Sequence, residues 1–370
     1  MSSATRRINN TRSIERIADA VLYEGYILYP YRPSSVKNQQ RWNFGVLSPE
    51  AYAVAQGGSE SSSMLTECLV EIDSSSTLEV KIRFLHLMLR ELAEEIEDCR
   101  SFRANAGHFN EGSLHFRVVP AFEFNGRILQ PWQEAVDREV VIPRIKLNDL
   151  GLSQRQKFDF PSSKTTEPLM PTESGKNRGL ILRTQDAIVG EIEISTTLVL
   201  DSVSRDEAPK KQLVKLSIEI RNLTSFENAS ERSRDEALLH SFVSTHTILE
   251  VDNGAFVSLL DPPDEYKSAA HECTNTGTYP VLVGEEGDHG FMLSSPIILY
   301  DYPQIAPESA GDLFDGTEID EILTLRIMSL TDDEKREMRG ADVLARQLLE
   351  RTESLSAEEM MSLHGVMKKA

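Results

Sequence analysis

The sequence is poor in cysteine and in long apolar runs. It holds 3 cysteines in 370 residues, too few for a disulfide framework or a four-cysteine metal site, which favours a reducing compartment. No stretch approaches the roughly 20 consecutive apolar residues that cross a bilayer. The most apolar early segment, residues 21–31, contains Glu24 and Pro30. No leader with an uncharged apolar segment and a small-residue cleavage site is seen. These absences predict a cytoplasmic protein without a membrane span.

Basic residues are scarce relative to acidic ones. The 39 Lys and Arg against 59 Asp and Glu give a net charge of −20. Such an acidic surface repels phosphate backbones, so the sequence argues against a nucleic-acid partner. The sequence also lacks a Walker A loop, a dinucleotide-binding glycine motif after a strand, an HExxH motif and a nucleophile elbow. No complete catalytic set is present, and an enzymatic role is the less favoured interpretation.

Residues 1–147 contain both helix and strand patterns, which predict an α+β domain. Apolar residues at Ile14, Ile17, Ala18 and Val21 have the spacing of an amphipathic helix over residues 11–22. Two strands are expected at 69–72 and 78–84, with a turn at 73–77. A second one-sided helix is predicted over 85–99, and it would hold Cys99. An Asn-Gly pair at 125–126 predicts a type I′ hairpin.

The composition changes near residue 148. Residues 148–178 are rich in Pro, Ser and Thr and have little periodicity, which predicts a linker or a long surface loop. Residues 179–307 are then expected to form a β-rich domain, sandwich-like or barrel-like. Its clearest strand is 214–220, where apolar and polar residues alternate. The other predicted strands are 188–200, 242–251, 255–260, 279–283 and 297–300, with a hairpin turn at Asn253-Gly254.

Residues 308–370 are predicted to form an acidic segment followed by short helices. Capping-box patterns occur at 331–334 and 356–359, and a helix is expected over 343–351. Short helices are marginal alone and must dock on another surface. The predicted fold class is therefore α+β, with an N-terminal α+β domain, a β-rich second domain and a short helical C-terminal tail.

The first candidate site is a basic and aromatic stretch at residues 29–44. Arg and Lys side chains can bind an anion near a helix start, and Tyr, Trp and Arg dominate protein-interface hot spots. The alternative interpretation is a solvated helix face, with the aromatic residues in a core. The candidate residues for partner or anion binding are Tyr31, Arg32, Lys37, Asn38, Arg41 and Trp42.

The second candidate site is acidic. Residues 308–321 contain no basic residue, and carboxylates at this density can bind hard cations or present a negative docking face. They can equally be the first turn of a helix, where they complement its dipole. The residues assigned to acidic docking are Glu308, Asp312, Asp315, Glu318 and Asp320. A third interpretation is that this segment packs against residues 29–44 as architecture.

A transition-metal site is a further hypothesis. His271, Cys273 and His289 carry imidazole and thiolate ligands, although their spacing matches no structural zinc motif. Cys273 with His271 is also the one candidate pair for a thiol nucleophile. Exposed loop histidines are the alternative interpretation. Cys68 and Cys99 are expected to be core cysteines.

Two segments resemble a known family. Residues 22–46 read LYEGYILYPYRPSSVKNQQRWNFGV, and residues 293–325 read LSSPIILYDYPQIAPESAGDLFDGTEIDEILTL, followed by SLTDDEKREMRGAD. Both resemble a bacterial protein family encoded alongside high-affinity nickel–iron hydrogenases. The resemblance transfers no catalytic residue. It implies a cytoplasmic accessory role in making, assembling or coupling a hydrogenase.

The leading hypothesis is therefore a non-enzymatic accessory protein whose partner is a hydrogenase subunit or maturation factor. No cofactor is predicted under this hypothesis. The alternatives are a metal-dependent enzyme or metal chaperone, which would use the His and Cys residues or the clustered carboxylates, and a purely structural module.

Overall fold

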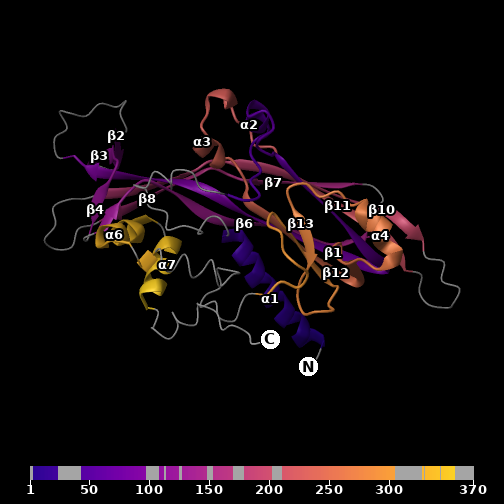
Figure 1. Cartoon of the computed structure of the whole chain (residues 1–370). Helices are drawn as coiled ribbons and strands as arrows, with labels where there is room; N and C mark the ends of the chain where they lie inside the picture. The colour runs from indigo at the N-terminus through magenta and orange to yellow at the C-terminus, as the bar shows by residue number, and fades with distance from the viewer. Residues whose placement is uncertain are drawn as a thin grey trace.

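A computed structural model describes residues 3–23, 43–96, 108–111, 114–124, 127–147, 153–169, 179–201, 211–304, 327–328, 330–341 and 343–354. Its main feature is a 12-stranded antiparallel sheet. The sheet is built around the 33-residue strand β1 (Ser63–Glu95). Figure 1 shows β2, β3, β4 and β8 at one end of the molecule and β10 and β11 at the other. The structure confirms the predicted α+β fold class with its β-rich character. The N-terminal α+β domain stays a prediction.

Strand β1 pairs with different strands along its length. Its residues 63–72 pair with β11 (Gln212–Asn222), residues 69–85 with β12 (Val243–Val257), and residues 77–90 with β6 (Trp132–Lys146). Residues 89–94 then pair with β9 (Gly179–Gln185), and residues 92–95 with β3 (Leu114–Val119). Every part of the large sheet is therefore connected through one strand.

The remaining strands extend the sheet outward. On one side lie β14 (Phe291–Ser295) and then the edge strand β13 (Tyr279–Leu282); on the other lie β10 (Ile188–Asp201) and then β7 (Gln154–Phe160). β8 (Ser163–Leu169) pairs with β9, and β2 (His108–Glu111) pairs with β3. β4 (Phe122–Phe124) and β5 (Arg127–Leu129) form a separate two-stranded sheet.

One face of the sheet encloses the largest core. The alternating apolar residues of β11 point into it, together with residues of β1, β10 and β12. Phe84 lies at its aromatic centre, with ring centroids of Phe242 and Phe158 at 4.7 Å and 6.0 Å. This arrangement confirms the prediction that one face of residues 214–220 is apolar and buried.

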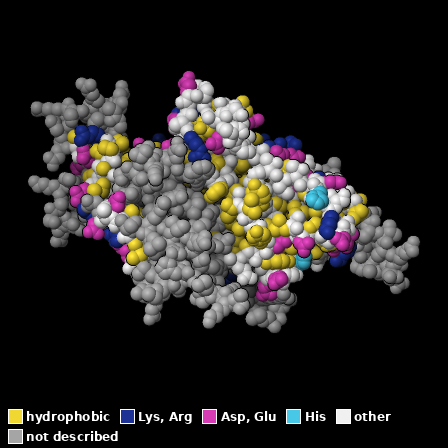
Figure 2. All heavy atoms as spheres, viewed as in Figure 1, with side chains coloured by type: hydrophobic (Ala, Val, Ile, Leu, Met, Phe, Trp, Pro, Cys, Tyr) yellow, Lys and Arg dark blue, Asp and Glu magenta, His cyan; other side chains and the backbone are white. Residues whose placement is uncertain are grey.

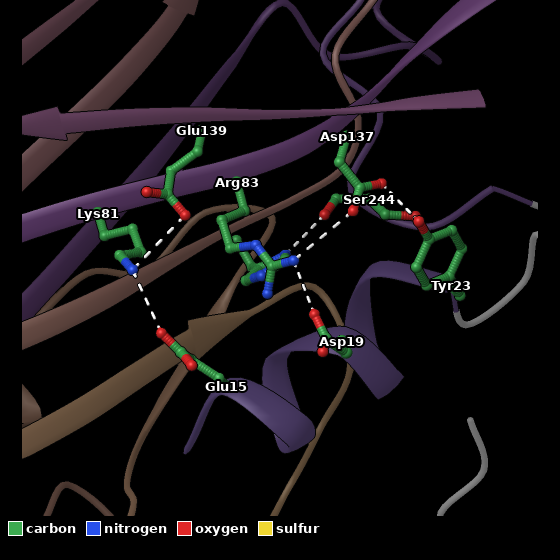
Figure 3. A network of polar contacts seen from close by, with 9 residues as sticks. Glu15, Asp19, Tyr23, Lys81, Arg83, Asp137, Glu139 and Ser244 are labelled. Atoms are coloured by element: carbon green, nitrogen blue, oxygen red, sulfur yellow. Dashed lines mark hydrogen bonds and ion pairs between the residues drawn. The ribbon is translucent and has the colours of Figure 1, made fainter. Parts of the chain in front are cut away.

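Helix α1 (Ser3–Tyr23) packs on the opposite face and confirms the predicted helix at 11–22. Ile14, Ile17, Ala18 and Val21 are buried against apolar residues of β12, β13 and β14. The polar side of α1 is also held. Asp19 accepts a 2.7 Å hydrogen bond from Arg83, and the Tyr23 hydroxyl donates to Asp137 at 2.6 Å (Figure 3).

The other helices are short. They are α2 (Glu50–Ala55), α3 (Arg234–Leu238), α4 (Lys267–His271), α6 (Asp332–Ala341) and α7 (Val343–Ser354), with 3₁₀ turns η4 (Ala229–Glu231) and η5 (Asp264–Tyr266). The capping box predicted for α6 is confirmed, because Thr331 N donates to Glu334 at 2.7 Å and Glu334 N donates back to the Thr331 hydroxyl at 3.3 Å. The box predicted at 356–359 lies outside the described residues.

The predicted helix over residues 85–99 is wrong. Residues up to Glu95 continue β1, and residues 97–99, Cys99 included, lie outside the described part. The predicted linker at 148–178 contains β7 and β8, which pair with β10 and β9. The hairpin at 125–126 is supported, because Phe124 pairs with Arg127, although the two turn residues themselves are not described.

Two further local predictions are corrected. Asn253-Gly254 is not a hairpin turn, since β12 runs through both residues. Residues 297–300 form no strand; the strand in this region is β14. The strands predicted at 188–200 and 279–283 are confirmed as β10 and β13.

The sheet draws strands from both sides of the predicted linker, because β1, β3 and β6 precede it and β9 to β14 follow it. Whether residues 1–147 and 179–307 are separate folding units stays a prediction. Among the described residues, no helix is both long enough and apolar enough to span a membrane.

Candidate functional site

A pocket of about 300 Å³ lies where five segments of the chain meet. Its lining comes from residues 43–47, residues 59–64 at the start of β1, Arg234 of α3, Gly277 and Tyr279 at the start of β13, and Pro296 after β14. Its volume is at the lower end of the range of small-molecule sites. The pocket is therefore built by long-range contacts.

Backbone pairing fixes residues 43–47 in the pocket wall. Ser244 N donates to the Phe44 carbonyl at 3.0 Å, and Leu47 exchanges two hydrogen bonds with Phe242 at 2.8 and 3.1 Å. Gly45 has φ +54°, and a Cβ there would lie 2.8 Å from the ring of Pro296. Glycine is required at this position both for its backbone conformation and for its close approach to Pro296.

Charge on the pocket wall is internally paired. Glu60 accepts a hydrogen bond from Arg234 Nε at 3.0 Å. Arg234 follows Ser233, whose hydroxyl accepts from Glu236 N at 3.3 Å to complete a capping box. Hydrogen bonds from the Ser233 backbone and from Arg232 lower the pKa of Glu236 to about 2. The ion pair and the cap together position Arg234 beside the pocket.

Asn43 is the unusual polar residue of this wall. Its amide nitrogen and oxygen are both buried, and neither has a hydrogen-bond partner among the residues that the structure describes. Nearby buried hydroxyls are satisfied instead, because the Ser294 hydroxyl lies 2.7 Å from that of Thr66 and 2.6 Å from that of Thr278. A buried amide without a partner costs stability unless water or another group satisfies it.

Residues 296–302 run from the pocket along the surface with alternating directions. Ile297 and Leu299 pack inward against the cluster formed by α1, β12, β13 and β14. Ile298 and Tyr300 point outward and are 74% and 86% exposed. Tyr279 of β13 is 46% exposed. Figure 2 shows hydrophobic side chains gathered on the surface in the region of β13.

The segment is anchored beyond Tyr300. The Asp301 carboxylate accepts from Leu282 N at 2.8 Å and from the Ser258 hydroxyl at 2.5 Å. Tyr302 N donates to the Leu282 carbonyl at 2.7 Å. Ile298 and Tyr300 are therefore exposed on a backbone that is fixed at both sides. We call Tyr279, Ile298 and Tyr300 the apolar rim.

The first two sets of predicted site residues lie outside the described residues. These are Tyr31, Arg32, Lys37, Asn38, Arg41 and Trp42, and Glu308, Asp312, Asp315, Glu318 and Asp320. The two longer segments that carry the family resemblance nevertheless meet at the pocket. Asn43, Gly45 and Val46 come from residues 22–46, and Pro296 comes from residues 293–325.

The predicted metal ligands are described and are not gathered. His271 is exposed at the end of α4, and His289 is exposed with Nδ1 2.9 Å from the Phe256 carbonyl. In the described parts of the chain, no group of three or more His, Cys, Asp or Glu side chains could hold a metal ion. The hypothesis of a His271, Cys273 and His289 site gains no support from the geometry.

The cysteines have the character of packing residues. Cys68 is fully buried in β1, as predicted. The Cys273 thiol lies 3.6 Å from the Ala269 carbonyl, and burial with the nearby Glu67 carboxylate raises its pKa to about 11. A thiol with a raised pKa is protonated at neutral pH and is a poor nucleophile. The thiol-nucleophile hypothesis therefore gains no support.

Ile298, Tyr300 and Arg234 were not predicted as site residues. The sequence contains a signal for the first two, since four consecutive apolar residues at 297–300 precede Asp301. A strand that is buried on both faces gives the same pattern. The position of Arg234 in the pocket depends on contacts across 174 residues of sequence, which no local pattern reports.

No family model and no curated protein matches the chain. Among solved structures, the chain is weakly similar to a chain of the Klebsiella pneumoniae type II secretion system outer membrane complex (PulD, PulS and PulC HR domain), with 10% identity and a TM-score of 0.07. The match covers 60% of this chain and 44% of the other, so this chain spans less than half of that protein's length. A similarity at this TM-score carries no argument about fold or function.

Proposed function

We propose that the protein is a non-enzymatic accessory protein that acts by binding a protein partner through the apolar rim. From the family resemblance, the proposed partner is a hydrogenase subunit or a maturation factor. The proposed role is in the assembly, maturation or coupling of a nickel–iron hydrogenase.

The observation that supports this proposal is the exposure of Ile298 and Tyr300 on an anchored backbone. Burying a large apolar side chain at an interface contributes about 1.5–3 kcal/mol. Because Ile297, Leu299 and Asp301 already fix the segment, binding would order little additional backbone. Large apolar side chains in a fixed position are suited to bind a preformed groove on a partner.

The edge of the sheet beside the rim favours side-chain contacts over strand addition. Pro280 of β13 has no backbone N–H, and both backbone groups of Leu282 are already bonded, N–H to Asp301 and C=O to Tyr302. A partner strand would find few free backbone groups along β13. The rim would therefore contact its partner through Tyr279, Ile298 and Tyr300.

Co-purification tests this proposal. Tagged wild-type protein should recover hydrogenase subunits or maturation factors from cells that express the hydrogenase. The double variant Ile298→Ser/Tyr300→Ser should lower the recovery at least tenfold, since each lost contact weakens binding by more than about 1.4 kcal/mol. Val54→Ser is the matched control, because Val54 on α2 is 72% exposed and lies outside the rim.

Two results would contradict the proposal. One is the absence of any hydrogenase-related protein in the wild-type sample. The other is equal recovery by wild type and by the double variant. Circular dichroism of both variants should match wild type, because exposed side chains contribute little to folding.

A further inference from the structure

The large sheet is split beside residues 86–88 of β1. On one edge of β1, pairing with β12 ends at Leu85 and Val243, and pairing with β9 begins at Leu89 and Thr184. On the other edge, β6 pairs without interruption from Thr77 to Arg90, apart from one irregularity near residue 79. Within the described residues, the first edge at 86–88 therefore has no partner strand.

Polar side chains gather at this split, and several of their atoms have no partner. His86 is 0% exposed and Gln185 is 4% exposed. In the part of the chain that the structure describes, the amide nitrogen of Gln185, Nε of Arg138 and Nδ1 of His240 are buried without a hydrogen bond, whereas the His86 ring faces the backbone carbonyls of Asp186 and Leu239. Buried polar groups are nearly always satisfied by protein, water or an ion, so three unpaired atoms at one place require an explanation.

These groups are neighbours. Arg138 Nη2 donates to Gln185 Oε1 at 2.8 Å, and the guanidinium lies 4.6 Å from the ring centroid of Phe160. Burial, the charge of Arg138 and the nearby His240 together lower the pKa of His86 to about 4. Hydrogen bonds from its ring to the backbone carbonyls of Asp186 and Leu239 oppose this shift in pKa. His86 thus lies between Arg138 and the two segments that border the split.

The charge of the cluster is positive. Among the described residues, Arg138 has no carboxylate within 4.0 Å, and its guanidinium hydrogen bond is to a neutral amide. The nearby Asp186 carboxylate lies 3.4 Å from Nε2 of His240, the ring nitrogen other than the unpaired one. At neutral pH His86 is uncharged, so Arg138 carries the positive charge of the cluster without a carboxylate partner among the described residues.

We propose that the split in the sheet binds a small monovalent anion, of the class of chloride, nitrate or formate, through Arg138 and Gln185. Nε of Arg138 and the Gln185 amide would supply the donors. A single charge matches the one guanidinium, whereas a dianion would be disfavoured by Asp186 nearby.

Thermal unfolding at constant ionic strength tests the site. Chloride, nitrate or formate replaces gluconate over the low millimolar range at pH 7.5, so screening does not change. We expect a saturable rise in the Tm of the wild type by about 3 °C, as for a ligand that binds only the native state. Arg138→Gln should abolish the rise. Arg155→Gln should keep it, because this control removes an equal charge from a 58% exposed side chain on β7.

Gln185→Met provides the second test, because it removes one amide donor and keeps the charge of Arg138. We expect about a tenfold increase in the anion concentration that gives half the rise. This measurement decides the question if Arg138→Gln does not fold. The proposal is overturned if the wild type shows no saturable rise, if Arg138→Gln responds as the wild type does, or if Gln185→Met leaves the half-saturating concentration unchanged.

Discussion

At the scale of single residues, two buried histidines make the stability of the fold depend on pH. His246 of β12 is 0% exposed, and its Nδ1 donates to the Ser244 carbonyl at 2.9 Å. Burial, aided by the nearby Arg83, lowers its pKa to about 3. His86 behaves similarly, with a pKa of about 4. Both rings are therefore neutral at physiological pH.

A histidine whose pKa is lowered in the native state makes the protein less stable as the pH falls. The unfolded chain takes up the proton near pH 6.5, whereas the native state takes it up only near pH 3 for His246. Stability is therefore complete above pH 6.5 and falls as the pH decreases between these values. One pKa unit corresponds to about 1.4 kcal/mol, so His246 alone accounts for a loss on the order of 5 kcal/mol.

Urea unfolding between pH 7 and pH 4 measures the larger part of this loss, about 3 kcal/mol. His246→Asn keeps a hydrogen-bond donor and removes the titration, so its free energy of unfolding should vary less with pH than that of the wild type. His271→Asn, which changes an exposed histidine on α4, should retain the wild-type slope. An unchanged slope in His246→Asn would refute the assignment.

Single residues also show what the sequence can and cannot reveal about the site. The segments around residues 22–46 and 293–325 are recognisable as strings, and their described parts do line one pocket. The exposure of Ile298 and the burial of Ile297 are not readable from four adjacent apolar letters. They depend on where α1 and β13 lie, which is long-range information.

At the scale of elements, β1 explains the largest error of sequence interpretation. Residues 85–96 contain Leu, Glu, Met and Ala, which favour helix. In the structure this stretch continues β1 as far as Glu95, paired with β6, β9 and β3 in turn and with apolar clusters on both faces, so the alternation expected of a strand is lost. Arg90, only 5% exposed, is tolerated because Glu134 of β6 pairs with it at 3.1 Å.

The Asn253-Gly254 error has a different cause. Asn253 does adopt a positive φ of 55°, as the turn chemistry predicts. Four residues of β1, 73–76, lie opposite Asn253 alone, because Ile72 pairs with Gly254 and Thr77 with Asp252. The Ser76 hydroxyl donates to the Asn253 carbonyl at 2.5 Å. The local conformation was predictable, but a bulge and a hairpin share that signal.

Helix α1 gives a prediction at this scale. Asp19 pairs with Arg83 at 2.7 Å, and the Arg83 side chain is only 13% exposed (Figure 3). Asp19→Ala should lower the free energy of unfolding by about 1.5 kcal/mol, because it removes a charged hydrogen bond from a largely buried guanidinium. Urea unfolding at pH 7 measures this difference.

Glu15→Ala is the matched control on the same helix. Glu15 is 49% exposed and lies 3.7 Å from Lys81, so its loss should cost about 0.5 kcal/mol or less. Equal effects of the two substitutions would show that the ionic side of α1 does not fix its docking. In that case the buried residues Ile14, Ile17 and Val21 would be sufficient.

At the scale of the whole molecule, β1 pairs with strands from both sides of the predicted linker. It pairs with β3 and β6 before the predicted linker and with β9, β11 and β12 after it. A chain of residues 1–147 would keep β1 and lose those three later strands. Val80 and Phe84 of β1 belong to the same core cluster as Leu216 and Phe242. In the fragment these later residues would be missing, and the β1 side chains would lose that packing.

We therefore expect residues 1–147, expressed alone, to give no cooperative thermal transition and rapid amide exchange along β1. Residues 148–370 alone should behave in the same way, because β9, β11 and β12 would lose the strand that joins them. Mixing the two fragments should restore a transition, since pairing along the 33 residues of β1 is long enough to bring them together. A fragment 1–147 that folds by itself would instead establish the N-terminal unit as an independent domain, and the shared strand would then be an interface between domains rather than the centre of one core.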